Sequence, residues 1–344
     1  MTQSRVTIRD VAAAAGVSIT TVSHVLTNAS GKRIAAETRS RVHRAATDLG
    51  YAANPVARTL RTQRSQSVGL VGDEIATTPF AGKIILGAQD VVRKHDAVLL
   101  VTNTAYDAEL EQREIRALLD RHVDGILYAA MYHRVLAVPA VLHGGPVVVL
   151  NARTEDPAVS WVVPDEYAGG WDAADVLVQA GHRVVGMVNN EDDIPASHLR
   201  EAGFRARCAQ AGLSDANITV VYASPLPEGA YGATVRLLAQ ENRPTGLFAF
   251  NDRMAMGAYR AAAVGGLRIP TDLSVVGFDN LEIIAEGLYP SLTSLTLPHY
   301  EMGAWAADQL YAQIDAPAGA PAPVRTAKLR CPVVHRASVT SPPR

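Results

Sequence analysis

Residues 6–26 read VTIRDVAAAAGVSITTVSHVL, and this stretch decides the fold of the N-terminal region. Thr7 precedes Asp10 by three residues, a spacing that lets a hydroxyl and a carboxylate satisfy free backbone N–H groups at a helix start. Apolar residues then recur at the helical period until Gly16, which favours a stop. Because Ser18 can cap a second helix, the stretch predicts a helix-turn-helix.

The second helix of this motif would present polar side chains to solvent. At about 100° per residue, Thr20 and His24 point almost directly away from its apolar side, with Ser23 beside them. Hydroxyl and imidazole groups on a helix can bond base edges in the major groove of DNA. A three-helix bundle with an unrelated polar face would fit the same pattern. A third helix is expected, with its inward residues and its stop at Val42, Ala45, Ala46, Leu49 and Gly50.

The charge of the chain is divided unevenly along its length. Residues 1–64 carry ten Lys or Arg against three Asp or Glu, whereas the other 280 residues carry 22 against 31. A basic N-terminal region on an acidic remainder indicates that only the former meets a polyanion. This asymmetry favours DNA as its partner over an arbitrary solvated face.

The stretch 6–26 resembles the DNA-binding head of the LacI/GalR family of bacterial transcriptional regulators. The resemblance implies a sequence-specific repressor, active as a homodimer on palindromic double-stranded operator DNA and controlled by a small-molecule effector. It places base contacts at Ile19, Thr20 and His24, and phosphate contacts at Thr7, Ser18, Thr21 and Ser23. We also expect Lys32 and Arg33, in the loop after the second helix, to contact the DNA backbone, and Tyr51 to contact DNA. Ile19 departs from the polar or aromatic residues common at its position and could only touch a thymine methyl group or exclude a wrong base.

Residues 51–67 are expected to form a hinge helix and linker. Asn54 followed by Pro55 is typical of a helix start, and the helix that follows is too short to be stable alone in water. The resemblance implies DNA contacts at Asn54 and Arg61, with Leu60 wedged into the minor groove. Alternatively, Leu60 packs on the next domain.

From residue 68 onward, short apolar segments alternate with helical patterns, which predicts parallel sheets covered on both faces. The expected strands are 68–72, 98–101, 125–128, 147–150, 161–163, 184–188, 219–222, 246–250, 274–278 and 292–295. These are too many for one comfortable sheet, so we expect an α/β body of two lobes, like a periplasmic binding protein. We assign residues 1–50 to the head and 68–344 to the body. One lobe would comprise 68–161 with 290–320, and the other 162–289 with 321–340.

Polar residues follow many of these strands, where ligands bind in such folds. They are Asp73, Asn103, Asn151, Asp165, Asn189, Asn190, Asn251, Asp252, Asp279 and Asn280. For any single one, capping the next helix is the more common role. The resemblance implies effector contacts at Arg200 and Asp252, and less directly at Phe80, Asn151 and Asp165.

The effector class follows from the resemblance only in part. Most relatives sense sugars or sugar derivatives, so a sugar is the first expectation, with a nucleobase or another metabolite as alternatives. Residues 223–227 read ASPLP, where sugar-sensing members often carry an aromatic ring, and Asn151 stands where a carboxylate occurs in the lactose repressor.

Other classes of protein are less consistent with the sequence. No nucleotide-binding or nucleophile-elbow motif occurs, which argues against a sugar-processing enzyme. Two distant cysteines and scattered histidines predict no metal site, disulfide or cofactor. No membrane-length apolar run or secretory signal precedes the head, which argues against a solute-binding transport protein and for a cytoplasmic one. No heptad tail follows the body, so a dimer is expected rather than a coiled-coil tetramer.

Overall fold

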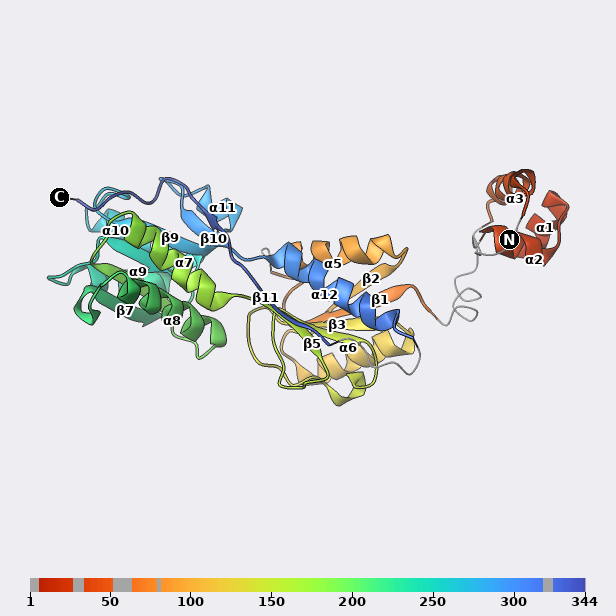
Figure 1. The fold of residues 1–344 in the computed structure, drawn as a ribbon, viewed down its shortest axis with the longest axis horizontal. Helices are drawn as coiled ribbons and strands as arrows, with labels where there is room; N and C mark the ends of the chain where they lie inside the picture. Colours follow the sequence, from red (N-terminus) through yellow and green to blue (C-terminus); the bar gives the residue numbers. More distant parts are fainter. Residues whose placement is uncertain (1–5, 27–33, 52–63, 79–81, 318–323, 344) are drawn as a thin grey trace. The chain divides into compact units, whose positions relative to one another are not determined.

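The computed structural model describes residues 6–26, 34–51, 64–78, 82–317 and 324–343 (Figure 1). The chain forms two compact units, residues 1–65 and 66–344. The head lies in the first unit and the body in the second. The division falls inside the segment expected to be the hinge. Within the described residues, no helix combines the length and apolar character needed to cross a bilayer.

The head contains the expected helix-turn-helix, formed by α1 (Ile8–Ala15) and α2 (Ile19–Leu26), with α3 (Ala36–Asp48) bracing both. Asp10 accepts hydrogen bonds from the Thr7 N–H and hydroxyl groups, each at 2.8 Å. Gly16 ends α1 in the left-handed conformation at φ 63°, which glycine adopts without steric cost. The three helices bury their apolar faces against one another through Val11, Ala12, Ala15, Val22, Val25, Val42, Ala45 and Ala46.

One detail of the expected head is wrong. Leu49 was expected to face the core, but its side chain is 38% exposed because α3 ends at Asp48 and Leu49 is the C-cap residue. Gly50 then takes a positive φ of 64°, which turns the chain, and the Tyr51 N–H donates to the Ala46 carbonyl at 2.8 Å. The helix therefore ends at Asp48, one residue before the last position that was expected to face the core.

The body contains two six-stranded sheets. The order in the first sheet is β11-β5-β4-β3-β1-β2, and in the second β12-β10-β9-β8-β6-β7. All neighbouring strands are parallel except β10 and β12. The strands of the first sheet are β1 (Ser67–Gly72), β2 (Val98–Asn103), β3 (Gly125–Ala129), β4 (Val147–Leu150), β5 (Ser160–Pro164) and β11 (Thr326–Leu329). Those of the second are β6 (Val185–Asn190), β7 (Ile218–Ala223), β8 (Gly246–Ala249), β9 (Ser274–Asp279), β10 (Thr293–Thr296) and β12 (Val333–Val334).

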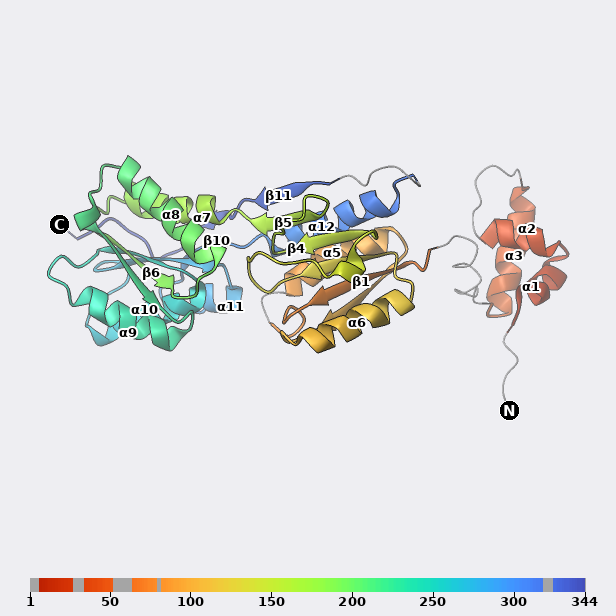
Figure 2. The same cartoon turned by 90° about the horizontal axis from the view of Figure 1, so that it is seen from below.

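Helices cover both faces of each sheet. In the first lobe, α5 (Gly82–Lys94) and α12 (His299–Ile314) pack together on one face, and α6 (Ala108–Asp120) lies on the other (Figure 2). In the second lobe, α7 (Glu166–Gln179) and α8 (Pro195–Gln210) cover one face, and α9 (Pro227–Leu238) and α10 (Asp252–Val264) the other. The short elements are η1 (Ala140–Leu142), η2 (Asp215–Asn217) and α11 (Glu282–Ala285). Strands buried on both faces explain the near-continuous apolar runs.

The boundaries of the lobes differ from the expected ones. β10 was expected in the first lobe but pairs with β9 of the second, Thr293 opposite Val276. β11 was expected in the second lobe but extends the first sheet beside β5, Thr326 opposite Trp161. The chain therefore passes between lobes after β5, after β10 and after β11. Local patterns specify a strand but not the sheet edge on which it pairs.

Candidate functional site

The start of α2 carries the polar groups expected to contact DNA. The Ser18 hydroxyl accepts the Thr21 N–H at 3.1 Å and is 2.9 Å from the Thr21 hydroxyl, so these side chains hold the first turn together. Ser18, Ile19 and Thr20 are exposed. Thr7 is also exposed, at the start of α1. The positions expected to reach phosphates and bases at this end of the helix are therefore accessible.

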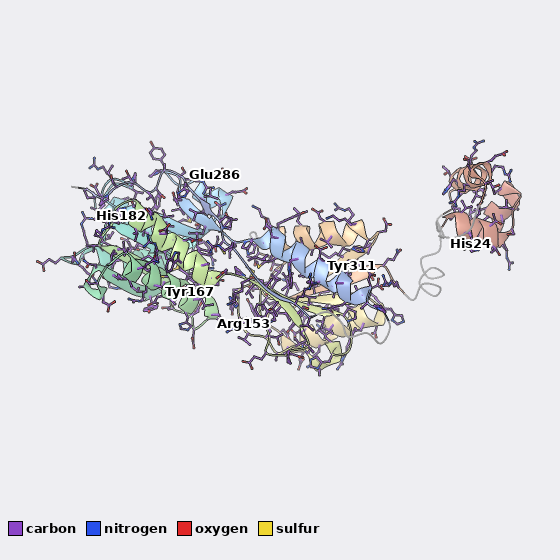
Figure 3. The ribbon with its side chains drawn as sticks, viewed as in Figure 1. His24, Arg153, Tyr167, His182, Glu286 and Tyr311 are labelled. Carbon is purple, nitrogen blue, oxygen red and sulfur yellow. The ribbon has the colours of Figure 1, made fainter. Side chains whose placement is uncertain are left out.

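The remaining expected DNA contacts in the head are less open. Ser23 and His24 are half-buried; Figure 3 labels His24 in the head. Nδ1 of His24 is enclosed without a hydrogen-bond partner among the described residues. Tyr51 is half-buried against the apolar core of the head. The predictions for Lys32, Arg33, Asn54, Leu60 and Arg61 lie outside the described residues.

In the body, a cavity of about 670 Å³ lies at the carboxyl ends of strands from both sheets. In each sheet the order reverses beside the first strand of the lobe, between β1 and β3 and between β6 and β8. Loops on either side of such a reversal separate and leave room for a ligand. The cavity is lined by Glu74, Thr77, Thr78, Tyr106, Met131, Tyr132, His133, Asn151, Pro164, Glu166, Asn190, Asp192, Ile194, Ala196, Arg200, Pro225, Phe250, Asn251, Arg253, Asp279, Leu297 and His299.

Arg200 lies in the wall of this cavity, as expected. Its Nε donates to Glu166 Oε2 at 2.7 Å, and its Nη1 donates to the Phe250 carbonyl at 2.6 Å. The guanidinium carbon lies 3.6 Å from the ring centre of Phe278, so an aromatic face also holds the group. A Cβ at Gly170 would overlap the Arg200 backbone, so glycine on α7 permits the close approach of α8.

Asp279 is the carboxylate that the second sheet places in the cavity wall. Burial raises the pKa of Asp279 to about 7, against the opposing effect of the Arg200 and Arg253 guanidinium groups. Asp279 and Asn280 both have positive φ, 100° and 50°. Such backbone strain is tolerated where the surrounding structure fixes it, and it clusters at ligand sites.

Asn251 joins Asp279 in the wall and also caps α10, since its Oδ1 accepts the Met254 N–H at 2.7 Å. Asp252 was also expected to contact the effector, but the structure places its side chain elsewhere. Its side chain is fully buried and does not line the cavity. Its carboxylate accepts the Ser294 hydroxyl at 2.6 Å and the Leu281 N–H at 2.7 Å. Burial, followed by the negative charge of Asp279, raises the pKa of Asp252 to about 8.

Asp165 also lies outside the cavity wall, and its Oδ1 caps α7 by accepting the Ala168 N–H at 3.0 Å. Asn151 does line the cavity, at φ 57°, but its Nδ2 already donates to the carbonyl oxygens of Ala130 and Met131. Phe80 lies outside the described residues. Asp279 and Asn251 both belong to the polar strand ends seen in the sequence, which was the available signal for them.

The first lobe contributes aromatic and basic groups that sequence reasoning did not assign. Tyr106 and Tyr132 line the cavity, and the Arg134 guanidinium lies 5.4 Å from the ring centre of each. Arg134 is held by Asp73, which follows β1, at 3.0 Å. Burial raises the pKa of Tyr106 in spite of this nearby positive charge. These rings could stack on a flat or cyclic ligand.

Both units match known families. Residues 7–54 match the model of the bacterial regulatory proteins of the lacI family, and residues 174–339 match that of a periplasmic binding protein-like domain. The ribose operon repressor of Haemophilus influenzae is 30% identical over 312 residues, which cover 90% of this chain and 92% of that protein. The HTH-type transcriptional regulator DegA of Bacillus subtilis is 32% identical, over 87% of this chain and 89% of that protein.

Solved structures agree with these matches. A LacI-family transcriptional regulator from Rhizobium etli, 30% identical, superposes with a TM-score of 0.73 and covers 80% of this chain and 100% of that one. A lac repressor dimer bound to operator and an anti-inducer superposes with a TM-score of 0.78 at 24% identity. The match covers 98% of this chain and 100% of that one, and it supports the fold. A LacI-family regulator from Enterococcus faecium with bound ribose superposes with a TM-score of 0.64 at 26% identity, and the match covers 80% of this chain and 98% of that one.

Proposed function

The chain belongs to the LacI family of bacterial regulatory proteins, and we propose that it is a homodimeric repressor whose operator binding is controlled by a neutral sugar. It is a DNA-binding transcriptional regulator and not an enzyme. The observation that carries the sugar assignment is the side-chain composition of the cavity. Because its partner is DNA, we place the protein in the cytoplasm.

The charges in the cavity favour a ligand without negative charge. Four carboxylates line it, on Glu74, Glu166, Asp192 and Asp279, against the guanidinium groups of Arg200 and Arg253. The positive charge of Arg200 is already neutralised by Glu166 at 2.7 Å. Carboxylate, amide and guanidinium groups can accept from or donate to sugar hydroxyl groups with directional hydrogen bonds.

The aromatic rings supply the apolar part of such a site. Tyr106 and Tyr132 offer faces in the first lobe, in place of the ring that is missing from residues 223–227. Sugar rings present C–H groups that pack on aromatic faces. A nucleobase could also stack there, so a purine or pyrimidine is the second candidate.

The head would bind the operator through α2 and the start of α1. We assign phosphate contacts to Thr7, Ser18, Thr21 and Ser23, and base contacts to Ile19, Thr20 and His24. Thr20 is exposed and can donate or accept at a base edge. Ile19, 44% exposed, can only pack against a thymine methyl group or exclude a base that lacks one.

Apolar residues on the surface of the body support a homodimer. Val98 and Val101 are exposed on β2, the edge strand of the first sheet. Ile283 and Tyr289 in the second lobe are 89% and 97% exposed, so almost the whole of each large apolar side chain is in contact with water. Contact with a second copy would remove these surfaces from water.

The experiment uses DNA selected from a random pool by the purified full-length protein. Fluorescence anisotropy would follow its binding while a panel of neutral sugars, sugar phosphates and nucleobases is added. We expect a neutral sugar to change the affinity, and Asp279→Asn to abolish that change without altering affinity in the absence of ligand. Arg236→Ala, an exposed arginine on α9, is the control. A response only to nucleobases or phosphorylated compounds would contradict the sugar assignment.

A further inference from the structure

A second crevice, of about 370 Å³, lies between the lobes. It shares His133 and Ile194 with the cavity of about 670 Å³ that we propose binds the effector, the effector cavity. Its first-lobe wall comes from the loops after β3 and β4, from β5 and from β11. Its second-lobe wall is the start of α8. The remaining lining residues are Arg153, Val163, Asp193, Pro195, His198, Leu199 and Lys328. Figure 3 shows Arg153 at the edge of the first lobe that faces the second.

The first lobe contributes two positive charges to this crevice. The Arg153 guanidinium and the Lys328 ammonium groups are exposed, and neither forms a hydrogen bond or ion pair with another described side chain. The carboxylate in the lining is Asp193, which already contacts His198 Nε2 at 2.6 Å. Two cationic side chains therefore face the crevice without a matching anion among the described residues.

His133 gives an independent indication of a missing partner. Its side chain is only 4% exposed, and neither ring nitrogen has a hydrogen-bond partner among the described residues. The nearest carboxylate oxygen, Glu166 Oε1, is 3.8 Å from Nδ1, too far for a hydrogen bond. Burial, together with the positive charges of Arg153, Arg200 and Lys328, lowers the pKa of His133 to about 4. A buried imidazole without partners is costly unless a ligand satisfies it.

The second lobe adds the start of α8, a helix of 16 residues. Pro195 occupies its first turn, and Ile194 provides no side-chain cap. Pro195 has no N–H group, and those of Ser197 and His198 donate to the Ile194 carbonyl, so the helix start offers an anion the Ala196 N–H and the positive end of the helix dipole. His198, one turn into the helix, lines the crevice and is exposed.

We propose that this crevice binds a phosphate group, held by Arg153 and Lys328 from the first lobe and by the start of α8 from the second. The neutral imidazole of His133 donates one N–H to it. Because the anion contacts both lobes, it stabilises their closed arrangement and changes the affinity for a ligand in the adjoining cavity. The group is either free inorganic phosphate or the phosphoryl end of a metabolite.

Calorimetry on the full-length protein, with inorganic phosphate at constant ionic strength, tests this site. We expect one saturable site per chain, and an affinity at least about tenfold lower in Arg153→Ala/Lys328→Ala, because two charge-assisted hydrogen bonds are lost. Lys94→Ala, an exposed lysine on α5, should bind as the wild type does. If the double variant does not fold, Lys328→Met alone still tests the charge.

Two further measurements locate the phosphate and its source. Arg253→Ala removes a cation of the effector cavity and should leave phosphate binding unchanged. If glucose 6-phosphate binds more tightly than inorganic phosphate, and its affinity falls in Lys328→Met, the phosphate group in the crevice belongs to a phosphorylated metabolite. No saturable phosphate binding, or binding lost in Arg253→Ala and kept in the double variant, would overturn the proposal. The response of DNA binding to a neutral sugar does not require this crevice, so the two proposals fail separately.

Discussion

Asp252→Ala should destabilise the body of the protein without removing an effector contact. Asp252 is fully buried at the start of α10 and connects three segments of the second lobe. One oxygen accepts the Ser294 hydroxyl on β10, and the other accepts the Leu281 N–H ahead of α11. Alanine leaves the buried Ser294 hydroxyl and the partly buried Leu281 N–H without this acceptor.

The size of the effect follows from these two hydrogen bonds. A buried donor left without a partner costs about 1–3 kcal/mol, so the two together cost about 2–6 kcal/mol. Removal of a buried carboxyl group, whose pKa is raised to about 8, offsets part of this loss. We therefore expect a decrease of about 2–4 kcal/mol in the free energy of unfolding, a large fraction of the roughly 5–15 kcal/mol typical of a native protein.

Thermal and urea unfolding of the full-length variants measure this decrease, and at about 2–4 °C per kcal/mol the melting temperature falls by roughly 5–15 °C. Asp279→Asn is the matched control, because Asp279 lines the cavity and its substitution should cost the effector response but little stability. An Asp252→Ala protein with wild-type stability and no effector response would refute the reasoning and return Asp252 to the binding site.

The remaining predictions concern the two binding functions and pH. Arg200→Ala should abolish the effector response, measured by calorimetry with the active sugar, because it removes a donor and leaves Glu166 buried without its partner; unchanged ligand affinity would contradict this. His24→Ala should relax preference at one base pair by about 1–3 kcal/mol, and an equal loss on random DNA would indicate a backbone contact. Between pH 6.5 and about 8, where Asp252 and Asp279 hold protons in the native state that the unfolded chain has lost, stability should fall as pH rises. In urea unfolding, Asp279→Asn should make the decrease of the free energy of unfolding with pH less steep. The lowered pKa of His133 affects the free energy of unfolding only below pH 6.5, outside this range.

The sequence by itself determined the classes of structure in this protein. The helical period between Thr7 and Leu26, ended by Gly16, predicted the helix-turn-helix, and nearly every expected strand of the body lies within a residue or two of its place. These features are local, because periodicity, capping and apolar runs are properties of neighbouring residues. The position of Arg200 in the cavity wall was expected from the family resemblance, because a motif several residues long identifies both the helix and the side of that helix on which the arginine lies.

Only the tertiary structure decided how those elements meet. Strands β10 and β11 exchange lobes relative to expectation because the partner of a strand is chosen by tertiary packing and not by its own residues: β10 pairs with β9, Thr293 opposite Val276, and β11 pairs with a strand more than 100 positions away, Thr326 opposite Trp161. Asn251 and Asp252 are adjacent in sequence, yet only Asn251 lines the cavity, because the two positions point in different directions where β8 passes into α10. The crevice around His133 has no local signature at all. It exists because two loops and two strands of one lobe lie against the start of a helix in the other.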